Sequence, residues 1–259
     1  MRAAGVLFDK DGTLFDFEAT FAPACAAVAR DLAEGDEELA TRMCSAIGYD
    51  LAAGQFARDS IVIAGTAGDI AAAVASHLDL IETRELAARI DRLFERYSST
   101  SAVLFEGVAP MLLTLVGAGL SVGMATNDAE ANGRAHARIA GIDAHFRFFA
   151  GYDSGHGPKP GPGMVLAFAR AAGIAPHEVV MVGDSLHDMH AARAAGAISV
   201  AVTTGMASRD MLLAHADYVI GSMSELAAVP PIAAALARQL GCEGSEEPAK
   251  QASMPRTPA

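Results

Sequence analysis

Cysteine is scarce in this sequence: its 259 residues contain only Cys25, Cys44 and Cys242. No two of them form a CxxC pair, and their spacing gives no disulfide framework of the kind that stabilises small secreted domains. A chain of this length can bury a hydrophobic core without such crosslinks. The cysteine content therefore predicts a protein of a reducing compartment, the cytoplasm.

Basic residues are also few, since 19 lysines and arginines stand against 31 aspartates and glutamates, and the formal net charge is −12 at pH 7. Binding to a nucleic-acid backbone needs a surplus of Lys and Arg, so we expect no nucleic-acid partner. The negative field also gives no long-range steering to an anionic ligand. A phosphorylated ligand would need cations placed locally at its site.

The sequence also lacks an uninterrupted apolar run long enough to span a membrane. The stretch from Gly107 to Asn127 carries no charged residue, but one proline and three glycines interrupt it. This pattern indicates a buried helix, a turn and a buried strand. The apolar run after Arg2 is too short for a signal peptide, because Asp9 ends it. We predict neither a membrane segment nor a secretory leader.

Residues 17 to 104 have helical spacing of their apolar positions and no evident strand pattern. Gly35 is placed to end one helix and Asp36 to cap the next, while Thr66 and Asp69 have the spacing of a capping box. We predict that residues 17–104 form a separate all-helical module. Its expected helices are Glu18–Glu34, Asp36–Ile47, Thr66–Leu78 and Thr83–Tyr97.

Apolar strands alternate with helices in the rest of the chain, which predicts an α/β core with a parallel sheet and helices on both faces. Since the first strand precedes the helical module, that module is an insertion into a core of residues 1–16 and 105–240. The polar tail, 241–259, is expected to be disordered. The expected strands are Ala4–Phe8, Leu120–Ala125, Phe146–Ala150, Val179–Val182, Ile198–Val202 and Tyr218–Ile220. The expected helices are Val108–Val116, Asp128–Ile139, Gly163–Ala172, His187–Ala195, Arg209–Ala214 and Ser224–Leu240.

Two aspartates follow the first strand, in the segment Asp9-Lys10-Asp11-Gly12-Thr13. Residues i and i+2 of a strand share a face, so the two carboxylates would lie close together and repel each other. Either a shared proton or a cation must compensate them. The functional interpretation makes Asp9 a nucleophile toward phosphorus and Asp11 its proton-transfer partner. The alternative is a simple Asp-Gly turn.

Three further segments should converge at the same edge of a parallel sheet. Thr126 and Asn127 follow a strand and can hold a phosphoryl oxygen through a hydroxyl and a backbone N–H at a helix start. Lys159, in a loop of glycines and prolines, can neutralise a phosphoryl group. Asp184 suits a metal ligand, and Asp188 lies one helical turn on, where it can hold a metal-bound water or orient the lysine. Taken singly, each has an ordinary reading as a helix cap or an exposed side chain.

Together the four motifs resemble the haloacid dehalogenase superfamily of phosphohydrolases, whose pattern is DxDGT, a Thr after a strand, a Lys in a Gly/Pro loop and GDxxxD. The resemblance covers the α/β core, about two thirds of the chain, and implies a Rossmann-like fold. By position and helicity, the insertion is similar to the cap of phosphoglycolate phosphatase-like members. The namesake dehalogenases lack the second acid of the first motif, so the presence of Asp11 points to phosphoryl transfer.

The resemblance also implies roles for individual residues. Asp9 would be the nucleophile and Asp11 the general acid and base, with Thr126 and Lys159 on the phosphate. Mg²⁺ would be held by Asp9, Asp184, the Asp11 carbonyl and waters, since hard oxygen ligands suit it. The implied substrate is a small phosphorylated metabolite, with phosphoglycolate leading by resemblance alone. Sugar phosphates and nucleotide monophosphates stay open, and so does the oligomeric state.

Several alternatives remain beside this interpretation. A phosphosugar mutase of the same superfamily is one, and a non-enzymatic receiver-type signalling module is another, although a receiver's acid pair normally precedes its acceptor on another strand. A carbon–phosphorus hydrolase would need a lysine in its cap, and residues 17–97 contain none. No G-x-G-x-x-G follows the first strand, as a dinucleotide-binding oxidoreductase would require. In the cap, Arg58 is either a solvated side chain or a bidentate reader of a substrate carboxylate.

Overall fold

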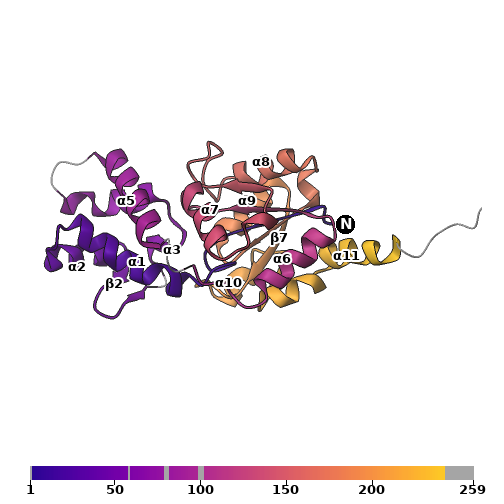
Figure 1. Cartoon of the computed structure of the whole chain (residues 1–259), viewed down its shortest axis with the longest axis horizontal. Coiled ribbons are helices and arrows are strands. Elements are labelled where there is room, and N and C mark those ends of the chain that lie inside the picture. The colour runs from indigo at the N-terminus through magenta and orange to yellow at the C-terminus, as the bar shows by residue number, and fades with distance from the viewer. Residues whose placement is uncertain (1, 58, 79–81, 99–101, 243–259) are drawn as a thin grey trace, which may run out of the picture.

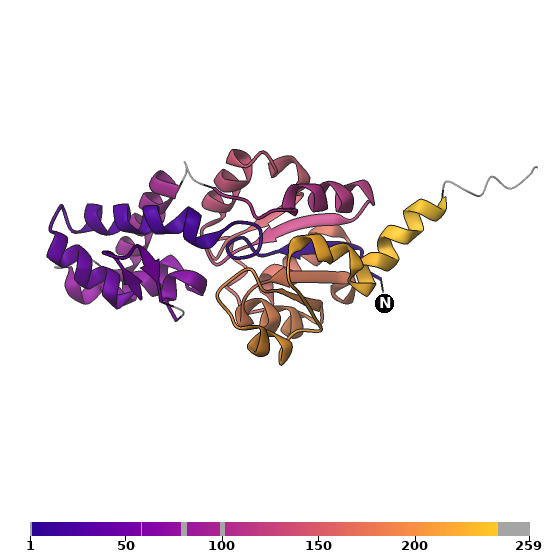
Figure 2. The same ribbon diagram turned by 90° about the horizontal axis from the view of Figure 1, so that it is seen from below.

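The computed structural model describes residues 2–57, 59–78, 82–98 and 102–242. These residues form two lobes, one built around a sheet and one mainly of helices (Figures 1 and 2). The predicted tail at 241–259 lies outside the described residues except for its first two positions, and those two belong to the last helix.

The sheet of the larger lobe is parallel throughout and has the strand order β5-β4-β1-β6-β7-β8. β1 lies inside the sheet, where its Phe8 pairs with Met124 of β4 on one side and with Val182 of β6 on the other. The predicted parallel sheet is confirmed, and every strand lies within two residues of its expected bounds. The strands are β1 (Gly5–Phe8), β4 (Ser121–Ala125), β5 (Phe148–Ala150), β6 (Val179–Gly183), β7 (Ile198–Val202) and β8 (Tyr218–Ile220).

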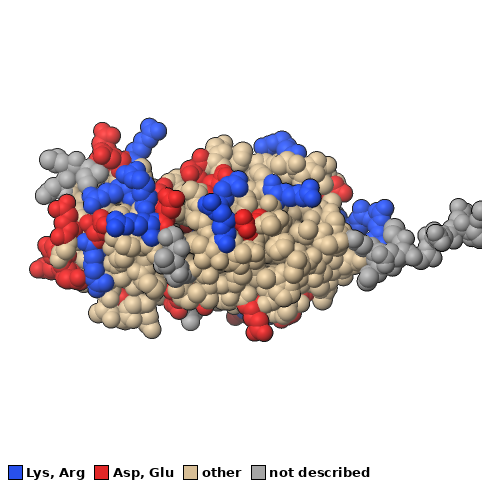
Figure 3. Space-filling model, in the orientation of Figure 1, with Lys and Arg blue, Asp and Glu red and all other residues tan. Residues whose placement is uncertain are grey.

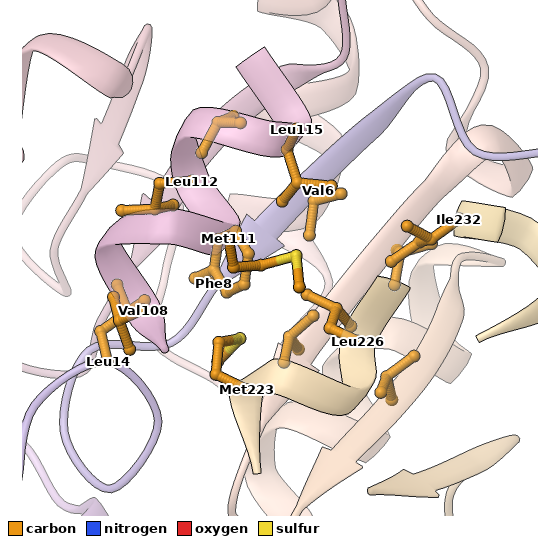
Figure 4. Close-up of a cluster of buried hydrophobic side chains, with 14 of the residues drawn as sticks. Val6, Phe8, Leu14, Val108, Met111, Leu112, Leu115, Met223, Leu226 and Ile232 are labelled. Atoms are coloured by element: carbon orange, nitrogen blue, oxygen red, sulfur yellow. The ribbon is translucent and has the colours of Figure 1, made fainter. Parts of the chain in front are cut away.

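Helices cover both faces of this sheet, because successive residues of a strand point to opposite sides. In β1, Val6 and Phe8 join the cluster of buried side chains shown in Figure 4, together with Leu112 of one helix and Leu226 of another. Leu7, between them, packs in the cluster on the opposite face. The first face is covered by α6 (Val108–Gly117), η4 (Met223–Ala228) and α11 (Pro230–Cys242), and the second by α8 (Gly163–Ala172) and α9 (Leu186–Ala195).

One expected helix, 224–240, proves to be two. The chain turns at Val229, whose backbone is extended, and Pro230 begins the second helix, α11. Proline suits the first turn of a helix because its missing N–H would have no partner there. The remaining helices of this lobe are α7 (Glu130–Ile139), α10 (Arg209–Leu213), η2 (Asp143–His145) and η3 (Pro176–Glu178).

The smaller lobe, called the cap here, has its own hydrophobic cluster, which includes Phe21, Met43, Ile90 and Phe94. The caps expected at its helix starts are present: Asp36 accepts from the backbone N–H groups of residues 38 and 39, each at 3.0 Å. A capping box opens α4 as predicted. Its helices are α1 (Phe17–Leu32), α2 (Glu37–Ala46), α3 (Ile61–Ala64), α4 (Ala67–Val74), η1 (Ala75–His77) and α5 (Thr83–Ser98).

The sequence predicts an all-helical cap, and this prediction is wrong in one place. β2 (Tyr49–Asp50) and β3 (Gln55–Phe56) form a small antiparallel hairpin. Strands of two residues are too short to show an alternation of apolar and polar positions, so their pattern was not detectable in the sequence. The expectation of a helical insertion otherwise agrees with the elements found.

The chain crosses between the lobes at two adjacent points. Asp16 donates its backbone N–H to Val103 at 2.8 Å, and Phe105 donates to Leu14 at 3.0 Å. The expected domain limits, 16/17 and 104/105, lie beside this crossing. Because the first crossing follows directly after the acidic turn of residues 9–13, the cap lies next to that turn (Figure 1).

Charges of both signs are interspersed over the cap in Figure 3. Two exposed ion pairs belong to this lobe, Arg30–Glu37 at 2.8 Å and Arg42–Glu38 at 2.7 Å. The uncharged stretch from Gly107 to Asn127 forms a helix, a turn and a strand, as predicted. Among the described residues, no helix has both the length and the apolarity needed to cross a membrane.

Candidate active site

Acidic side chains from two neighbouring strands meet at the carboxyl edge of the sheet. Asp9 follows β1, Asp184 follows β6, and Asp188 lies in the first turn of α9. All three residues are buried, and one carboxylate oxygen of each lies within 4.8 Å of those of the other two. The structure thus brings the predicted nucleophile and the predicted metal ligand to one place.

Lys159 lies between two of these acids. Its Nζ donates to Asp9 Oδ1 and to Asp188 Oδ1, each at 2.6 Å. Burial alone would lower the pKa of Lys159, but the two carboxylates outweigh burial, and the pKa lies above its usual value. The lysine is therefore a fixed positive charge inside the acidic cluster.

Asn127 holds the loop that carries this lysine. Its side-chain amide donates to the carbonyl of Lys159 at 2.9 Å and accepts from the lysine's backbone N–H at 2.8 Å. The sequence had suggested a direct phosphate contact for the Thr126–Asn127 pair. The side chain of Asn127 positions the Lys159 loop, while the phosphate contact through a backbone N–H stays a prediction.

Burial, and after it repulsion between the acids, raises the pKa values of the cluster. Burial raises the pKa of Asp9 to about 7, and the charge of Asp188 adds to the rise, while Lys159 opposes it. Burial and the charge of Asp9 also raise the pKa of Asp184 well above its usual value. Three carboxylates and one lysine leave an excess of buried negative charge, which a divalent cation would relieve.

The local backbone fits tightly around Asp184. A Cβ added to Gly12, whose φ is +74°, would lie 2.4 Å from Asp184 Oδ2, and one added to Gly205 would lie 1.7 Å from it. Thr13 donates its hydroxyl to Asp184 Oδ1 at 3.4 Å. A side chain at either position would collide with this carboxylate, and glycine avoids the collision. The oxygens of Asp184 are donors of the kind that a hard cation prefers.

Asp188 has both carboxylate oxygens engaged. Oδ1 accepts from Lys159, and Oδ2 accepts from the backbone N–H and the hydroxyl of Ser185 at 3.1 and 2.6 Å. Of the two roles open to Asp188 in the sequence, its contacts favour the one of orienting the lysine.

Lys10, which the sequence interpretation left without a role, is completely buried beside this cluster. Its Nζ lies 3.0 Å from Asp11 Oδ2, 2.7 Å from Asp128 Oδ2 and 3.2 Å from His136 Nδ1. It also stands 4.7 Å above the ring of Phe21, which belongs to the cap. The sequence did contain a signal for this role, because Lys10 lies between two aspartates at the end of an apolar strand.

Asp11 is held by this lysine through one oxygen only. Burial raises the pKa of Asp11 to about 6, and Lys10 opposes the rise. Its Oδ1 is buried and has no hydrogen-bond partner among the described residues. Asp11 also lines the cavity described below. The carboxylate is not part of the three-acid cluster, and the resemblance had assigned only its backbone carbonyl to a metal.

Thr126 is buried next to the cluster but not at a helix start. The helix α7 begins at Glu130 rather than at the expected position 128, and the backbone N–H of Thr126 donates to Ala150 within the sheet at 2.9 Å. The hydroxyl accepts from the N–H of Asp128 at 3.0 Å. The helix start expected here is therefore wrong. The hydroxyl proton of Thr126 can still be donated to a phosphoryl oxygen, and that contact stays a prediction.

A cavity of about 50 Å³ lies between the acidic cluster and the cap. Among its lining residues, Asp91 of α5 accepts a hydrogen bond from the hydroxyl of Tyr152, across the two lobes. Burial raises the pKa of Asp91 to about 6, against the opposing effect of this hydrogen bond. Arg58, the predicted cap contact, lies outside the described residues. The lining includes Asp9, Asp11, Thr126 and Lys159 from the core, and Phe21, Val62, Ile70 and Phe94 from the cap.

Fold and site together define an α/β protein with a buried acidic and cationic centre beneath a helical cap. The family described as haloacid dehalogenase-like hydrolase matches residues 3–196. The chain belongs to this hydrolase family. The assignment argues against the receiver-type alternative, which is not a hydrolase.

Individual relatives agree with the family assignment. A phosphoglycolate phosphatase from Shigella boydii serotype 4 is 33% identical over 57% of this chain and 61% of its own length. A protein named "Probable phosphatase IndB", from Dickeya dadantii, is 29% identical over 83% of this chain and 87% of its own length. The chain thus spans about three fifths of the phosphoglycolate phosphatase that it matches. The solved structure of a predicted phosphoglycolate phosphatase from Haemophilus somnus 129pt shares the fold, with a TM-score of 0.68 at 18% identity over 89% of this chain and 99% of that one.

Replacing Lys10 tests whether it balances the buried acids. We expect Lys10→Met to cost roughly 3–5 kcal/mol, a fall in Tm on the order of 10 °C, because Asp11 and Asp128 lose their cation. The double variant Lys10→Met/Asp128→Asn should recover part of this loss. Thermal unfolding of the three proteins measures both effects, and equal Tm values for the single variant and the wild type would contradict the assignment.

Divalent metal should stabilise the folded protein. Mg²⁺ at a hundredfold excess over its Kd contributes about 2.7 kcal/mol, and we expect Tm to rise by roughly 5–10 °C. Asp184→Asn should abolish this rise and, in EDTA, should melt above the wild type because it removes a buried negative charge. The exposed Asp210→Asn is the control and should keep the full response. A wild-type Tm that is the same in Mg²⁺ and in EDTA would show that no such site exists.

The raised pKa of Asp91 predicts a pH dependence of stability. Folding raises this pKa from 3.8 to about 6, so the folded state binds the proton more tightly than the unfolded chain. The protonated carboxyl favours the folded state over an ionised one. This contribution to the free energy of unfolding is complete below pH 3.8 and is lost as the pH rises through about 6. Asp91→Asn avoids this loss, so its Tm advantage over the wild type should grow from pH 4.5 to pH 7 and then level off. Glu95→Gln, an exposed acid one helical turn away, should not reproduce the trend.

Proposed function

We propose that the protein is a cytoplasmic, Mg²⁺-dependent phosphatase that hydrolyses a small phosphomonoester through an aspartyl-phosphate intermediate. The observation that carries the proposal is the contact of Lys159 with Asp9 inside the acidic cluster. Beside them lies an oxygen of Asp11 that has no hydrogen-bond partner in the described part of the chain. The residues that we propose as nucleophile, phosphate-binding cation and proton donor all line one cavity.

In the first half-reaction, an oxygen of Asp9 attacks phosphorus and forms a bond to it while the bond to the leaving oxygen breaks. Asp11 donates its proton to that leaving oxygen, so the product departs as a neutral alcohol. The raised pKa of Asp11, about 6, keeps a share of this carboxyl protonated near neutral pH. The contact with Lys10 holds the other oxygen, which fixes the direction of the donated proton.

In the second half-reaction, Asp11 accepts a proton from a water that attacks the phosphorus, and the bond between phosphorus and Asp9 breaks. Lys159 and the hydroxyl of Thr126 donate to the equatorial oxygens of the transferring group. Asp188 orients the lysine during both steps. Each proton that Asp11 gives in the first half returns to it in the second.

The donor set of Asp9 and Asp184 fits Mg²⁺, which would supply positive charge against the phosphate when it is bound. A site of this kind suits a small phosphorylated metabolite, and relatives of the chain are named phosphoglycolate phosphatases. Movement of the cap, with hinges near Asp16–Phe17 and Glu106–Gly107, would admit the substrate and then exclude bulk water.

Two substitutions test the mechanism. Asp9→Asn should abolish turnover, because an amide is a poor nucleophile toward phosphorus. Asp11→Asn should still bind phosphate but should lose roughly 10²–10⁴ in kcat, the usual contribution of a placed acid and base. Release of inorganic phosphate from a panel of phosphomonoesters, with Mg²⁺ and with EDTA, measures both. Near-normal activity of Asp9→Asn would refute the nucleophile, and isomerisation of a sugar phosphate without phosphate release would favour a mutase.

A further inference from the structure

The cavity has two chemically different ends. The core end carries Asp9, Lys159 and the other groups assigned to the phosphoryl group, and the core lobe adds Asp128, Ser185 and His187 to the lining. At the cap end, Asp91 is the one carboxylate among side chains that are otherwise apolar in the described lining, including Phe21, Val62, Ile70 and Phe94. A substrate whose phosphorus lies beside Asp9 would extend its leaving group toward this second end.

Asp91 is fixed there by the core lobe. The hydroxyl of Tyr152 donates to Asp91 Oδ2, and the Tyr152 side chain also packs against the hydrophobic cluster of the cap. The backbone N–H of Tyr152 donates to the carbonyl of Asp128 at 3.1 Å, which ties the tyrosine to the start of the α7 region. The carboxylate therefore has a defined position in the cavity rather than the freedom of a surface acid.

The charge at this position is negative at neutral pH. Burial raises the pKa of Asp91 to about 6, with Asp128 and Asp153 adding to the rise and Tyr152 and Arg92 opposing it. A pKa of 6 leaves the group mostly ionised at pH 7.5. An ionised carboxylate accepts hydrogen bonds and repels a second anion, and the effect is larger in a part-buried cavity than in water.

We infer that Asp91 selects the leaving group, and that the substrate is a phosphomonoester of an alcohol that donates hydrogen bonds and carries no carboxylate. This inference rests on the proposed phosphatase function and narrows its substrate class. The apolar cap side chains contact the carbon skeleton of the alcohol, and Asp91 accepts from a hydroxyl or an ammonium at its far end.

A substrate without a carboxylate differs from the phosphoglycolate that the names of several relatives suggest. Phosphoglycolate ends in a carboxylate, which would extend into the part of the cavity that Asp91 lines. Two anions in the same part-buried cavity repel each other, which disfavours binding. We therefore expect phosphoglycolate to be a poor substrate of this protein.

Three phosphomonoesters of nearly equal size test this expectation. Phosphoglycolate, 2-hydroxyethyl phosphate and phosphoethanolamine differ mainly in their last group, which is an anion, a neutral hydroxyl and a cation. With the wild type and Mg²⁺, kcat/KM for each of the last two should exceed that for phosphoglycolate by about tenfold or more. The ratio between the hydroxyl and the ammonium compounds tells which donor is preferred.

The variant Asp91→Asn keeps the shape of the side chain and removes its charge. It should raise kcat/KM for phosphoglycolate by about tenfold and lower that for phosphoethanolamine, with p-nitrophenyl phosphate as a reference substrate. Glu95→Gln removes one negative charge from the same helix, outside the cavity lining, and should leave all ratios unchanged. Thermal unfolding checks that both variants are folded.

The inference is overturned by a wild type that prefers phosphoglycolate, or by an Asp91→Asn variant with the wild-type ratios. A loss of phosphoglycolate activity in Arg58→Ala would point the same way, since that arginine would then bind the carboxylate. These results leave the phosphatase function intact. If the wild type hydrolyses neither the three compounds nor p-nitrophenyl phosphate, the proposed function fails and the inference fails with it.

Discussion

Repulsion among buried carboxylates governs the arrangement of this molecule's sheet edge. Asp9, Asp184 and Asp188 are held within 4.8 Å of one another, and one lysine stands among them. Glycines pack closely against Asp184, and the amide of Asn127 holds the loop that carries the lysine. Such an arrangement is costly to the folded state, and it is the kind of cost that functional sites carry. A divalent cation and a phosphate would each remove part of it.

A second charge centre lies behind the first and connects it to the cap. Lys10 contacts Asp11, Asp128 and His136 of the core and the ring of Phe21 in the cap. Asp11, which we assign to proton transfer, and Phe21 of the cap thus both contact Lys10. Movement of the cap would change the surroundings of that lysine, so access to the site and its electrostatics are linked.

The sheet, its flanking helices and the motif residues could be predicted from the sequence, because strand-end motifs in a parallel sheet must converge. Contacts made at long sequence separation could not. Nothing in the chain near Asp91 reveals that Tyr152 binds it, and Lys10 meets Asp128 only after 118 residues. The hairpin β2–β3 and the division of the last helix escaped notice for a local reason: two-residue strands and a single extended residue leave no periodic pattern.

The central place of β1 has a consequence for how the chain is made. This strand leaves the ribosome first, yet its two neighbours, β4 and β6, begin at Ser121 and Val179. At the usual pace of about 5–20 residues per second, β1 would wait many seconds for its second partner. During that interval the entire helical insertion is synthesised, while an apolar tetrapeptide, Gly5–Phe8, has both edges unpaired. During synthesis, this apolar strand therefore stays without either of its sheet partners until the whole insertion has been made.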